Sequence, residues 1–233
     1  MHHYFVTGTD TGVGKTHFCC GLLQQWQQQG LKPHCLKPIV SGCNLQQLLP
    51  EDDLSQLHRH CQHQATEDMS YFCALEPTAP NLTSQAKNQP LHAAEIANFC
   101  RTCLPQAAPC LIEGIGGWAC PINLQETMAD VAIRLSLPVI LVVGLRLGCL
   151  NHALLTYEQI QASGLRIAGW VANHIEPNMP YALENLDFLK GRLQVPCLAE
   201  IPFYNTGTHD HSALTAASLQ LTHQPPLTAD AKP

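Results

Sequence analysis

Short apolar stretches alternate along the chain with longer segments in which apolar and polar residues are mixed. The apolar stretches are nearly continuous and lie at residues 3–8, 33–40, 109–114, 138–145 and 166–173. Such stretches are typical of parallel strands that are buried on both faces. The segments between them predict helices at residues 16–29, 93–104, 128–135, 151–163 and 181–192. This alternation predicts an α/β fold with a doubly wound, mostly parallel sheet.

The domain organisation predicted from the sequence is simple. A chain of 233 residues is long enough for one α/β domain of ordinary size. We find no internal repeat and no linker-like segment, and we therefore expect a single domain over residues 1–222. Residues 223–233 are rich in proline, and we expect them to form a disordered tail.

Composition and charge exclude several classes of function. The formal net charge is −6 and the 12 lysines and arginines are scattered, whereas a nucleic-acid-binding protein needs a basic face. The longest apolar run, residues 137–145, is far too short to span a membrane. The chain has no secretory signal pattern, and its 12 cysteines have no regular spacing. We therefore expect a cytoplasmic protein with reduced thiols.

Ligands of an open parallel sheet bind at the carboxyl ends of its strands. In this chain the segments that follow the predicted strands are polar or rich in glycine, and they lie at residues 8–16, 37–41, 113–117, 147–151 and at Asn173. These segments are therefore the first candidates for a functional site.

The segment after the first predicted strand reads GTDTGVGKT. The usual phosphate loop is G-x-x-x-x-G-K-[ST], but here five residues separate Gly8 from Gly14, so the standard pattern fails by one position. Read from Thr11, the sequence is similar to the end of the deviant loop K-G-G-x-G-K-[ST] of dimeric ATPases. Asp10 stands where that loop has its first lysine. We therefore expect a P-loop NTPase-like fold with a deviant phosphate loop.

The chemistry of this loop suits a nucleotide. Gly12 and Gly14, with Val13 between them, allow backbone N–H groups to turn towards phosphate oxygens at the start of a helix. Lys15 supplies a positive charge to the β- and γ-phosphates, and Thr16 offers a hydroxyl to Mg²⁺. The sequence therefore predicts ATP as a co-substrate and Mg²⁺ as the metal.

Seven segments together resemble the dethiobiotin synthetase family. They are YFVTGTDTGVGKT, LKPIVSG, EPTAP, LIEGIGGW, LPVILVVGLRLGCLNHALLT, GWVAN and EIPF, in this order from residue 4 to about residue 204. The resemblance implies an ATP-dependent ligase of biotin biosynthesis. In that family CO₂ adds to one amine of 7,8-diaminopelargonic acid, ATP phosphorylates the resulting carbamate, and the second amine closes the ring to dethiobiotin.

The resemblance also implies which residues bind the substrate and act on it. Lys37, with Lys15 and Thr11, is expected to be catalytic, because these groups match those that face the carbamate and the migrating phosphoryl group. Thr11, Lys37, Ser41 and Gly117 are expected to bind the substrate. This chain has Gly12 where the family often has glutamate, so one family contact to the substrate has no counterpart.

The family match makes Glu113 a ligand of Mg²⁺ together with Thr16. A further carboxylate is expected from the helix that follows LQQLLP, where Glu51, Asp52 and Asp53 are the candidates. The family pattern D-x-L favours Asp52, and Asp53 stays open as an alternative.

Other segments are expected to bind the adenine base or a second subunit. The nucleotide-binding residues implied by the resemblance, beyond those of the loop, are Glu113, Gly116, Asn173, His174, Pro202, Phe203 and Tyr204. The family is dimeric, and a helix N-terminus from one subunit receives the substrate carboxylate of the other. Here that role falls to Cys149, Leu150 and Asn151, although an ordinary helix cap explains Asn151 equally well.

Two other readings and one motif carry less weight. A partition-type switch ATPase needs the first lysine of the deviant loop, and a cobyrinate-type amidating ligase usually carries an added glutaminase domain, for which 233 residues leave no room. The segment HRHCQHQ contains His58, His60, Cys61 and His63, but its spacing fits no standard zinc motif. We expect no zinc site there.

Overall fold

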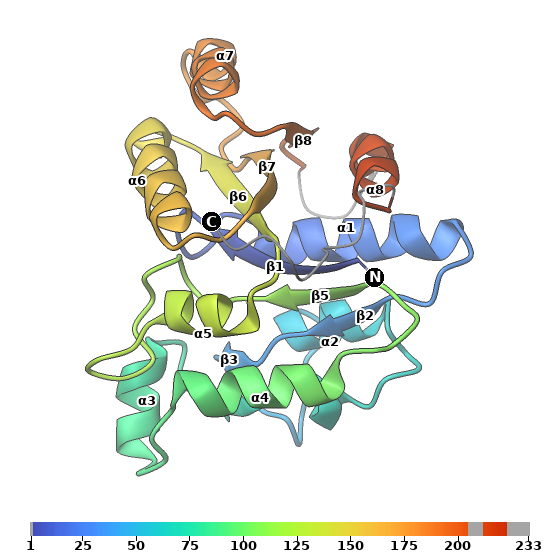
Figure 1. Ribbon diagram of the computed structural model, residues 1–233, viewed down its shortest axis with the longest axis vertical. Helices are drawn as coiled ribbons and strands as arrows, with labels where there is room; N and C mark the ends of the chain where they lie inside the picture. The colour runs from blue at the N-terminus through green and yellow to red at the C-terminus, as the bar shows by residue number, and fades with distance from the viewer. Residues whose placement is uncertain (1, 205–211, 223–233) are drawn as a thin grey trace.

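The chain folds around a six-stranded parallel sheet, as the computed structural model in Figure 1 shows. The structure describes residues 2–204 and 212–222, so the tail expected at residues 223–233 lies outside the described residues. The strands are β1 (His3–Gly8), β2 (His34–Leu36), β3 (Ile39–Ser41), β4 (Phe72–Ala74), β5 (Cys110–Glu113), β6 (Val139–Leu145), β7 (Ile167–His174) and β8 (Cys197–Ile201). The α-helices are α1 (Lys15–Gln28), α2 (Asp53–His58), α3 (Pro80–Ala86), α4 (Ala93–Cys103), α5 (Met128–Leu135), α6 (Cys149–Ala162), α7 (Ala182–Arg192) and α8 (Thr215–Thr222).

The strand order explains where a ligand site can form. The main sheet has the order β2-β5-β1-β6-β7-β8 with parallel pairs throughout, and β3 and β4 form a separate parallel pair. The chain crosses from β1 to β2 at one edge, returns to β5 beside β1, and then continues through β6 and β7 to β8 at the other edge. This change of direction places a topological switch point at the carboxyl end of β1. The predicted α/β class with a doubly wound parallel sheet is confirmed.

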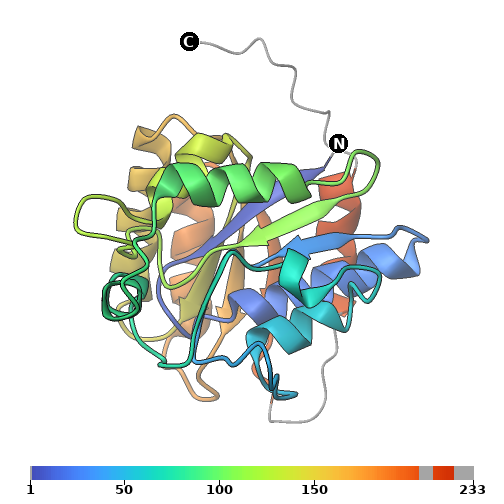
Figure 2. The same cartoon turned by 90° about the horizontal axis from the view of Figure 1, so that it is seen from below.

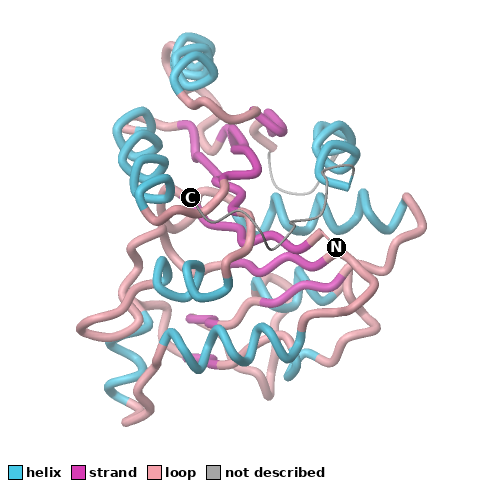
Figure 3. The backbone as a smooth tube through the Cα atoms, viewed as in Figure 1, coloured by secondary structure: helices cyan, strands magenta, loops and turns pink. Residues whose placement is uncertain are grey.

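Helices cover both faces of the sheet, as Figures 2 and 3 show. Successive strand residues alternate between the two faces, so that each face has its own core. Tyr4 and Val6 pack with α1, α2 and α8 on one face, whereas Phe5 packs with α4 and α5 on the other. Among the described residues no helix is long and apolar enough to cross a membrane.

One predicted strand is wrong. The stretch at residues 33–40 is divided into β2 and β3, with Lys37 and Pro38 between them. Pro38 has no N–H group to donate to a neighbouring strand, and the N–H of Lys37 instead donates to Met69 O at 2.8 Å. The chain therefore leaves the main sheet at Lys37. The five predicted helices are confirmed to within two residues at each end, while β4, β8, α3 and α8 were not predicted.

The C-terminal helix is attached to the first strand by a buried hydrogen bond. The hydroxyl of Tyr4 donates to Leu221 O at 2.7 Å, although the two residues are 217 positions apart in the chain. This contact and the side chains around it hold α8 on the face that α1 also covers.

We predict that Tyr4→Phe lowers the free energy of unfolding by about 1 kcal/mol, because it removes a buried hydrogen bond. Urea denaturation followed by circular dichroism measures this change. Tyr71→Phe is the matched control, since the Tyr71 hydroxyl donates to Glu95 at the surface, at 2.9 Å. Equal stability of Tyr4→Phe and the native protein would show that the contact contributes nothing to α8.

Candidate active site

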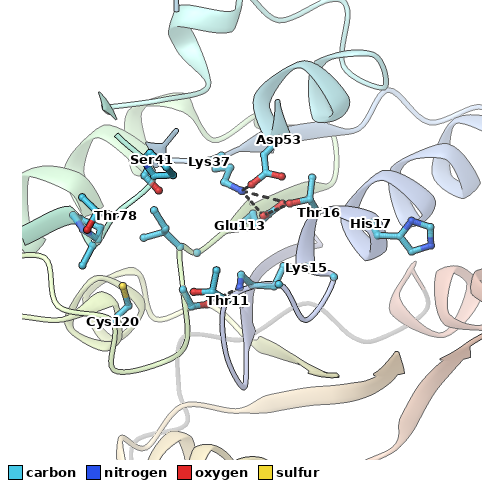
Figure 4. Close-up of a pocket in the computed structure, with 18 of the residues that line it drawn as sticks. Thr11, Lys15, Thr16, His17, Lys37, Ser41, Asp53, Thr78, Glu113 and Cys120 are labelled. Carbon is cyan, nitrogen blue, oxygen red and sulfur yellow. Dashed lines mark hydrogen bonds and ion pairs between the residues drawn. The ribbon is translucent and has the colours of Figure 1, made fainter. Parts of the chain in front are cut away.

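A pocket of about 660 Å³ lies at the carboxyl ends of β1, β2 and β5. Its lining comes from the loop before α1, from the segment around Lys37, from α2, from the residues after β4 and from those after β5 (Figure 4). The volume is that of a typical small-molecule site. It is located where the strand order predicts a ligand.

The phosphate loop has the backbone that its glycines allow. Gly12 and Gly14 have φ angles of 73° and 89°, in the left-handed region that side chains rarely adopt. Asn173, at the end of β7, donates from Nδ2 to Val13 O at 2.8 Å. A methyl group on Gly14 would lie 2.0 Å from that same nitrogen, so glycine is required there. Asn173, which we expected to contact adenine, therefore holds the loop in this structure.

Lys15 starts α1 and is only 7% exposed. Its ammonium donates to Asp10 O at 2.9 Å and to Gly116 O at 2.6 Å, so it lies across the mouth of its own loop. Burial lowers the pKa of Lys15, and the Glu113 carboxylate opposes that shift. The positively charged side chain is thus held at the position where a phosphate chain would enter.

Lys37 lies at the centre of a cluster of oxygen atoms (Figure 4). Its ammonium contacts Glu113 Oε1 at 2.7 Å, Thr16 Oγ1 at 3.5 Å and the carboxylate of Asp53. Burial by itself would lower the pKa of Lys37, but the two carboxylates outweigh it and raise the pKa above its ordinary value. The lysine side chain is therefore a fixed cation, 3% exposed.

Glu113 is fully buried at the end of β5. Its Oε1 accepts a hydrogen bond from Thr16 Oγ1 at 2.7 Å, whereas Oε2 has no hydrogen-bond partner among the described residues. The Cys19 thiol also lies against this carboxylate, and burial together with the carboxylate raises the pKa of the thiol. A buried carboxylate oxygen without a partner, beside a hydroxyl and a second carboxylate, suits a hard cation such as Mg²⁺.

The structure places the two neighbouring aspartates differently, and the choice of metal ligand between them stays a prediction. Asp53 lines the pocket and contacts Lys37, and that contact lowers the pKa of Asp53 in spite of its burial. Asp52 is the residue before α2, and its carboxylate accepts from Leu49 N at 2.7 Å. The first residue of α2, and not the cap before it, points into the site.

Opposite this cluster the pocket is lined by small polar side chains. Ser41, predicted to bind substrate, lies on this side together with Thr78 and Cys120, whereas Thr11, also predicted to bind substrate, lies beside Lys15 (Figure 4). We did not predict Thr78 and Cys120. The signal for Thr78 was present in the motif EPTAP, which forms the loop between β4 and α3.

The residues expected to bind the base lie around the end of β8. The ring of Tyr204 lies 6.0 Å from that of His17, which lines the pocket from the first turn of α1. His174 Nε2 lies 3.1 Å from Glu200 Oε1. Pro202 and Phe203 are exposed next to this pair. The pocket thus has an aromatic side near His17, a residue that the sequence reading missed.

The start of α6 lies outside the described lining of the pocket. Helix α6 begins at Cys149, after Gly148 with a φ of 91°. Cys149 is buried and Asn151 is exposed, and neither they nor Leu150 line the pocket in the described part of the chain. The loop before α6 is tied to the phosphate loop by an ion pair between Arg146 and Asp10.

The histidine-rich segment after α2 has structural contacts. His58 Nε2 lies 2.9 Å from Gln64 O, and the ring of His63 lies 4.6 Å from that of His34. Among the described residues no group of three or more His, Cys, Asp or Glu side chains is arranged to hold a metal ion. All 12 cysteines lie in the described ranges, and each is a free thiol.

The chain is similar to a known family and to several known proteins. A family model described as an AAA domain matches residues 2–211. The chain is 41% identical over 221 residues to the ATP-dependent dethiobiotin synthetase of Cellvibrio japonicus, covering 94% of this chain and 96% of that protein. It is 43% identical to the enzyme of the same name from Pseudescherichia vulneris, over 86% and 84% of the two chains.

The chain belongs to the ATP-dependent dethiobiotin synthetase family. Its members are ATP-dependent ligases, and the family resemblance found in the sequence is thereby confirmed. Among solved structures, the fold is similar to the septum site-determining protein MinD of Pyrococcus horikoshii, which was solved in complex with Mg-ADP. The TM-score is 0.57, with 18% identity over 95% of each chain. This likeness concerns the fold alone, and it confirms the P-loop NTPase-like architecture.

We predict that Gly14→Ala weakens ADP binding by at least about tenfold, since left-handed strain and the clash with Asn173 each cost about 1 kcal/mol or more. Titration calorimetry measures the affinity. Gly12→Ala is the matched control, because its φ is equally positive but a methyl group there meets nothing within 4 Å. Equal losses in both variants would mean that backbone strain alone, and not the Asn173 contact, sets the loop geometry.

Proposed function

We propose that this protein forms dethiobiotin from 7,8-diaminopelargonic acid, CO₂ and ATP, with release of ADP and phosphate. The observation that carries the proposal is the convergence of Lys15, Lys37 and Glu113 in one pocket, together with Thr11 and Ser41, in a chain of this family. Phosphoryl transfer to a carbamate needs cations at the phosphates and a dry, well-ordered place for the two amines.

The phosphate chain of ATP would bind at the start of α1. The backbone N–H groups of the phosphate loop and the positive end of α1 attract phosphate oxygens. Lys15 now donates to two carbonyl groups of the protein, and it would exchange these for the β- and γ-phosphate oxygens. The base would lie on the side of His17 and Tyr204.

The oxygen atoms of Thr16, Glu113 and Asp53 would hold Mg²⁺. The fit is supported by Glu113 Oε2, which is buried without a hydrogen-bond partner among the described residues, and by a donor set made only of oxygen atoms. When bound, the ion would neutralise charge on the β- and γ-phosphates during transfer. The protein's part is to keep these three oxygen ligands together at the end of the phosphate loop.

Lys37 and the hydroxyls of Thr11 and Ser41 would act on the diamine. One amine forms a carbamate with CO₂, and a carbamate oxygen then attacks the γ-phosphorus atom while ADP leaves. The second amine attacks the carbonyl carbon of the mixed anhydride, phosphate departs and the cyclic urea forms. Lys37 would stabilise the negative charge of the carbamate, and the hydroxyls of Thr11 and Ser41 would orient it.

The carboxylate tail of the diamine would bind at a second subunit. Cys149, Leu150 and Asn151 form the start of α6, whose free N–H groups suit an anion, yet they lie outside the described lining of their own pocket. We therefore propose a homodimer in which each α6 start completes the partner's site.

The test of this function is direct. Purified protein with ATP, Mg²⁺, bicarbonate and the diamine should form dethiobiotin, detected by mass spectrometry, and should release one phosphate for each product molecule. Omission of the diamine is the control and should abolish phosphate release. Steady ATP hydrolysis without the diamine, and without product when it is present, would instead support the partition-type switch ATPase considered from the sequence.

We predict that Asp53→Asn raises the Mg²⁺ concentration needed for half-maximal activity at least about tenfold, because it removes a charged oxygen ligand. Asp52→Asn is the matched control and should change it less than about twofold, since an amide oxygen can still accept from Leu49 N. The Mg²⁺ dependence of product formation measures both. A larger change in the Mg²⁺ dependence for Asp52→Asn than for Asp53→Asn would assign the ligand role to Asp52.

A further inference from the structure

The ammonium of Lys37 occupies the place that the oxygen ligands would offer to a metal. Its three contacts are Glu113 Oε1, Thr16 Oγ1 and the carboxylate of Asp53, which are the groups assigned above to Mg²⁺. An ammonium has three N–H donors, and all three are directed at this set. Lys37 therefore has no donor left for Thr11, Ser41 or a carbamate elsewhere in the pocket.

Lys37 and a divalent ion cannot share this position. Mg²⁺ binds oxygen ligands at about 2.0–2.1 Å, and the ammonium already lies 2.7 Å from Glu113 Oε1. An ion bound by these three groups, through either oxygen of Glu113, would lie close to the ammonium and would take its contacts with Thr16 and Asp53. Entry of the metal therefore requires the lysine side chain to leave.

The side chain can leave without any change in the backbone. The main chain of Lys37 is fixed by its N–H bond to Met69 O and by Pro38, whose carbonyl accepts from Tyr71 N at 2.9 Å and from Phe72 N at 3.0 Å. The side chain of lysine has a flexible four-carbon stem, and Lys37 lines the same pocket as Ser41, four residues further along the chain. The pocket thus provides the space into which the ammonium would turn.

We propose that Lys37 is an internal substitute for the metal: its ammonium occupies the cation position in the metal-free protein, and a divalent ion displaces it towards Ser41. The proposal rests on the proposed function for the identity of the metal ligands. It explains why the buried carboxylate of Glu113 tolerates the absence of a metal, since a buried charge without a partner is strongly unfavourable. It also makes Lys37 available to a carbamate only after the metal has bound.

Mn²⁺ alone, without nucleotide, tests the competition between lysine and metal. Free Mn²⁺ measured by electron paramagnetic resonance gives the dissociation constant for the full chain. Lys37→Met should bind Mn²⁺ at least tenfold more tightly than the native protein, because the competing cation is gone. Lys190→Met is the matched control, since Lys190 pairs with Glu200 at 3.7 Å outside the pocket, and it should leave the constant unchanged.

The opposite results overturn the proposal. Equal or weaker Mn²⁺ binding by Lys37→Met would show that Lys37 does not compete with the metal, and failure of both proteins to bind Mn²⁺ would remove the shared position altogether. These measurements involve no turnover. A result that rules out competition between Lys37 and the metal is therefore distinguishable from failure of the proposed function, which the formation of dethiobiotin tests separately.

A second measurement uses the native chain and does not depend on the folding of a variant. A buried, ion-paired ammonium exchanges its protons slowly, and it should give a ¹H–¹⁵N signal that disappears in Lys37→Arg. Mg²⁺ alone should move or broaden this signal. If Mg²⁺ shifts the backbone amide of Thr16 and leaves the Lys37 signal in place, the lysine stays with its carboxylates and the proposal fails.

Discussion

The buried ion pair between Lys37 and Glu113 is the interaction on which the site depends. Glu113 is fully buried and Lys37 is 3% exposed, so neither charge is stabilised by water. Removing one partner of such a pair leaves an uncompensated buried charge, which typically costs about 3–5 kcal/mol. Two further side chains contact this pair: Thr16 donates to Glu113, and Asp53 pairs with Lys37. They come from α1 and α2, the two helices that begin at the pocket. The pair thus links β5, the phosphate loop and α2.

Strand register brings these two residues together. Leu36 of β2 is opposite Ile112 of β5, so the next residue of each strand, Lys37 and Glu113, projects from the same end of the sheet. On the other side of β5, Glu113 is opposite Val6 of β1, shortly before the phosphate loop. Pro38 then turns the chain away from the sheet, which leaves the lysine side chain directed at the site and not at another strand.

Asp10 distinguishes the phosphate loop of this chain from the deviant loop, which has its first lysine at this position. Here Asp10 pairs with Arg146, and its carboxylate also accepts from Thr11 N at 2.7 Å. An anionic residue at this position is held inside its own chain, next to a threonine that faces the pocket.

The sequence by itself determined the fold class, the positions of most strands and helices, and the phosphate loop, because strand burial, helix periodicity and glycine conformation act over a few neighbouring residues. It also indicated Lys37 and Glu113, since polar residues at the ends of buried strands meet at one edge. The break at Pro38 was missed because an apolar run does not show which residues pair with which strand. Only the tertiary structure showed that Asp53, and not Asp52, contacts Lys37, since the start of α2 sets which of the two neighbours faces the lysine. It alone brought Lys37 against Glu113, 76 positions away, because such a contact depends on strand order and not on local sequence.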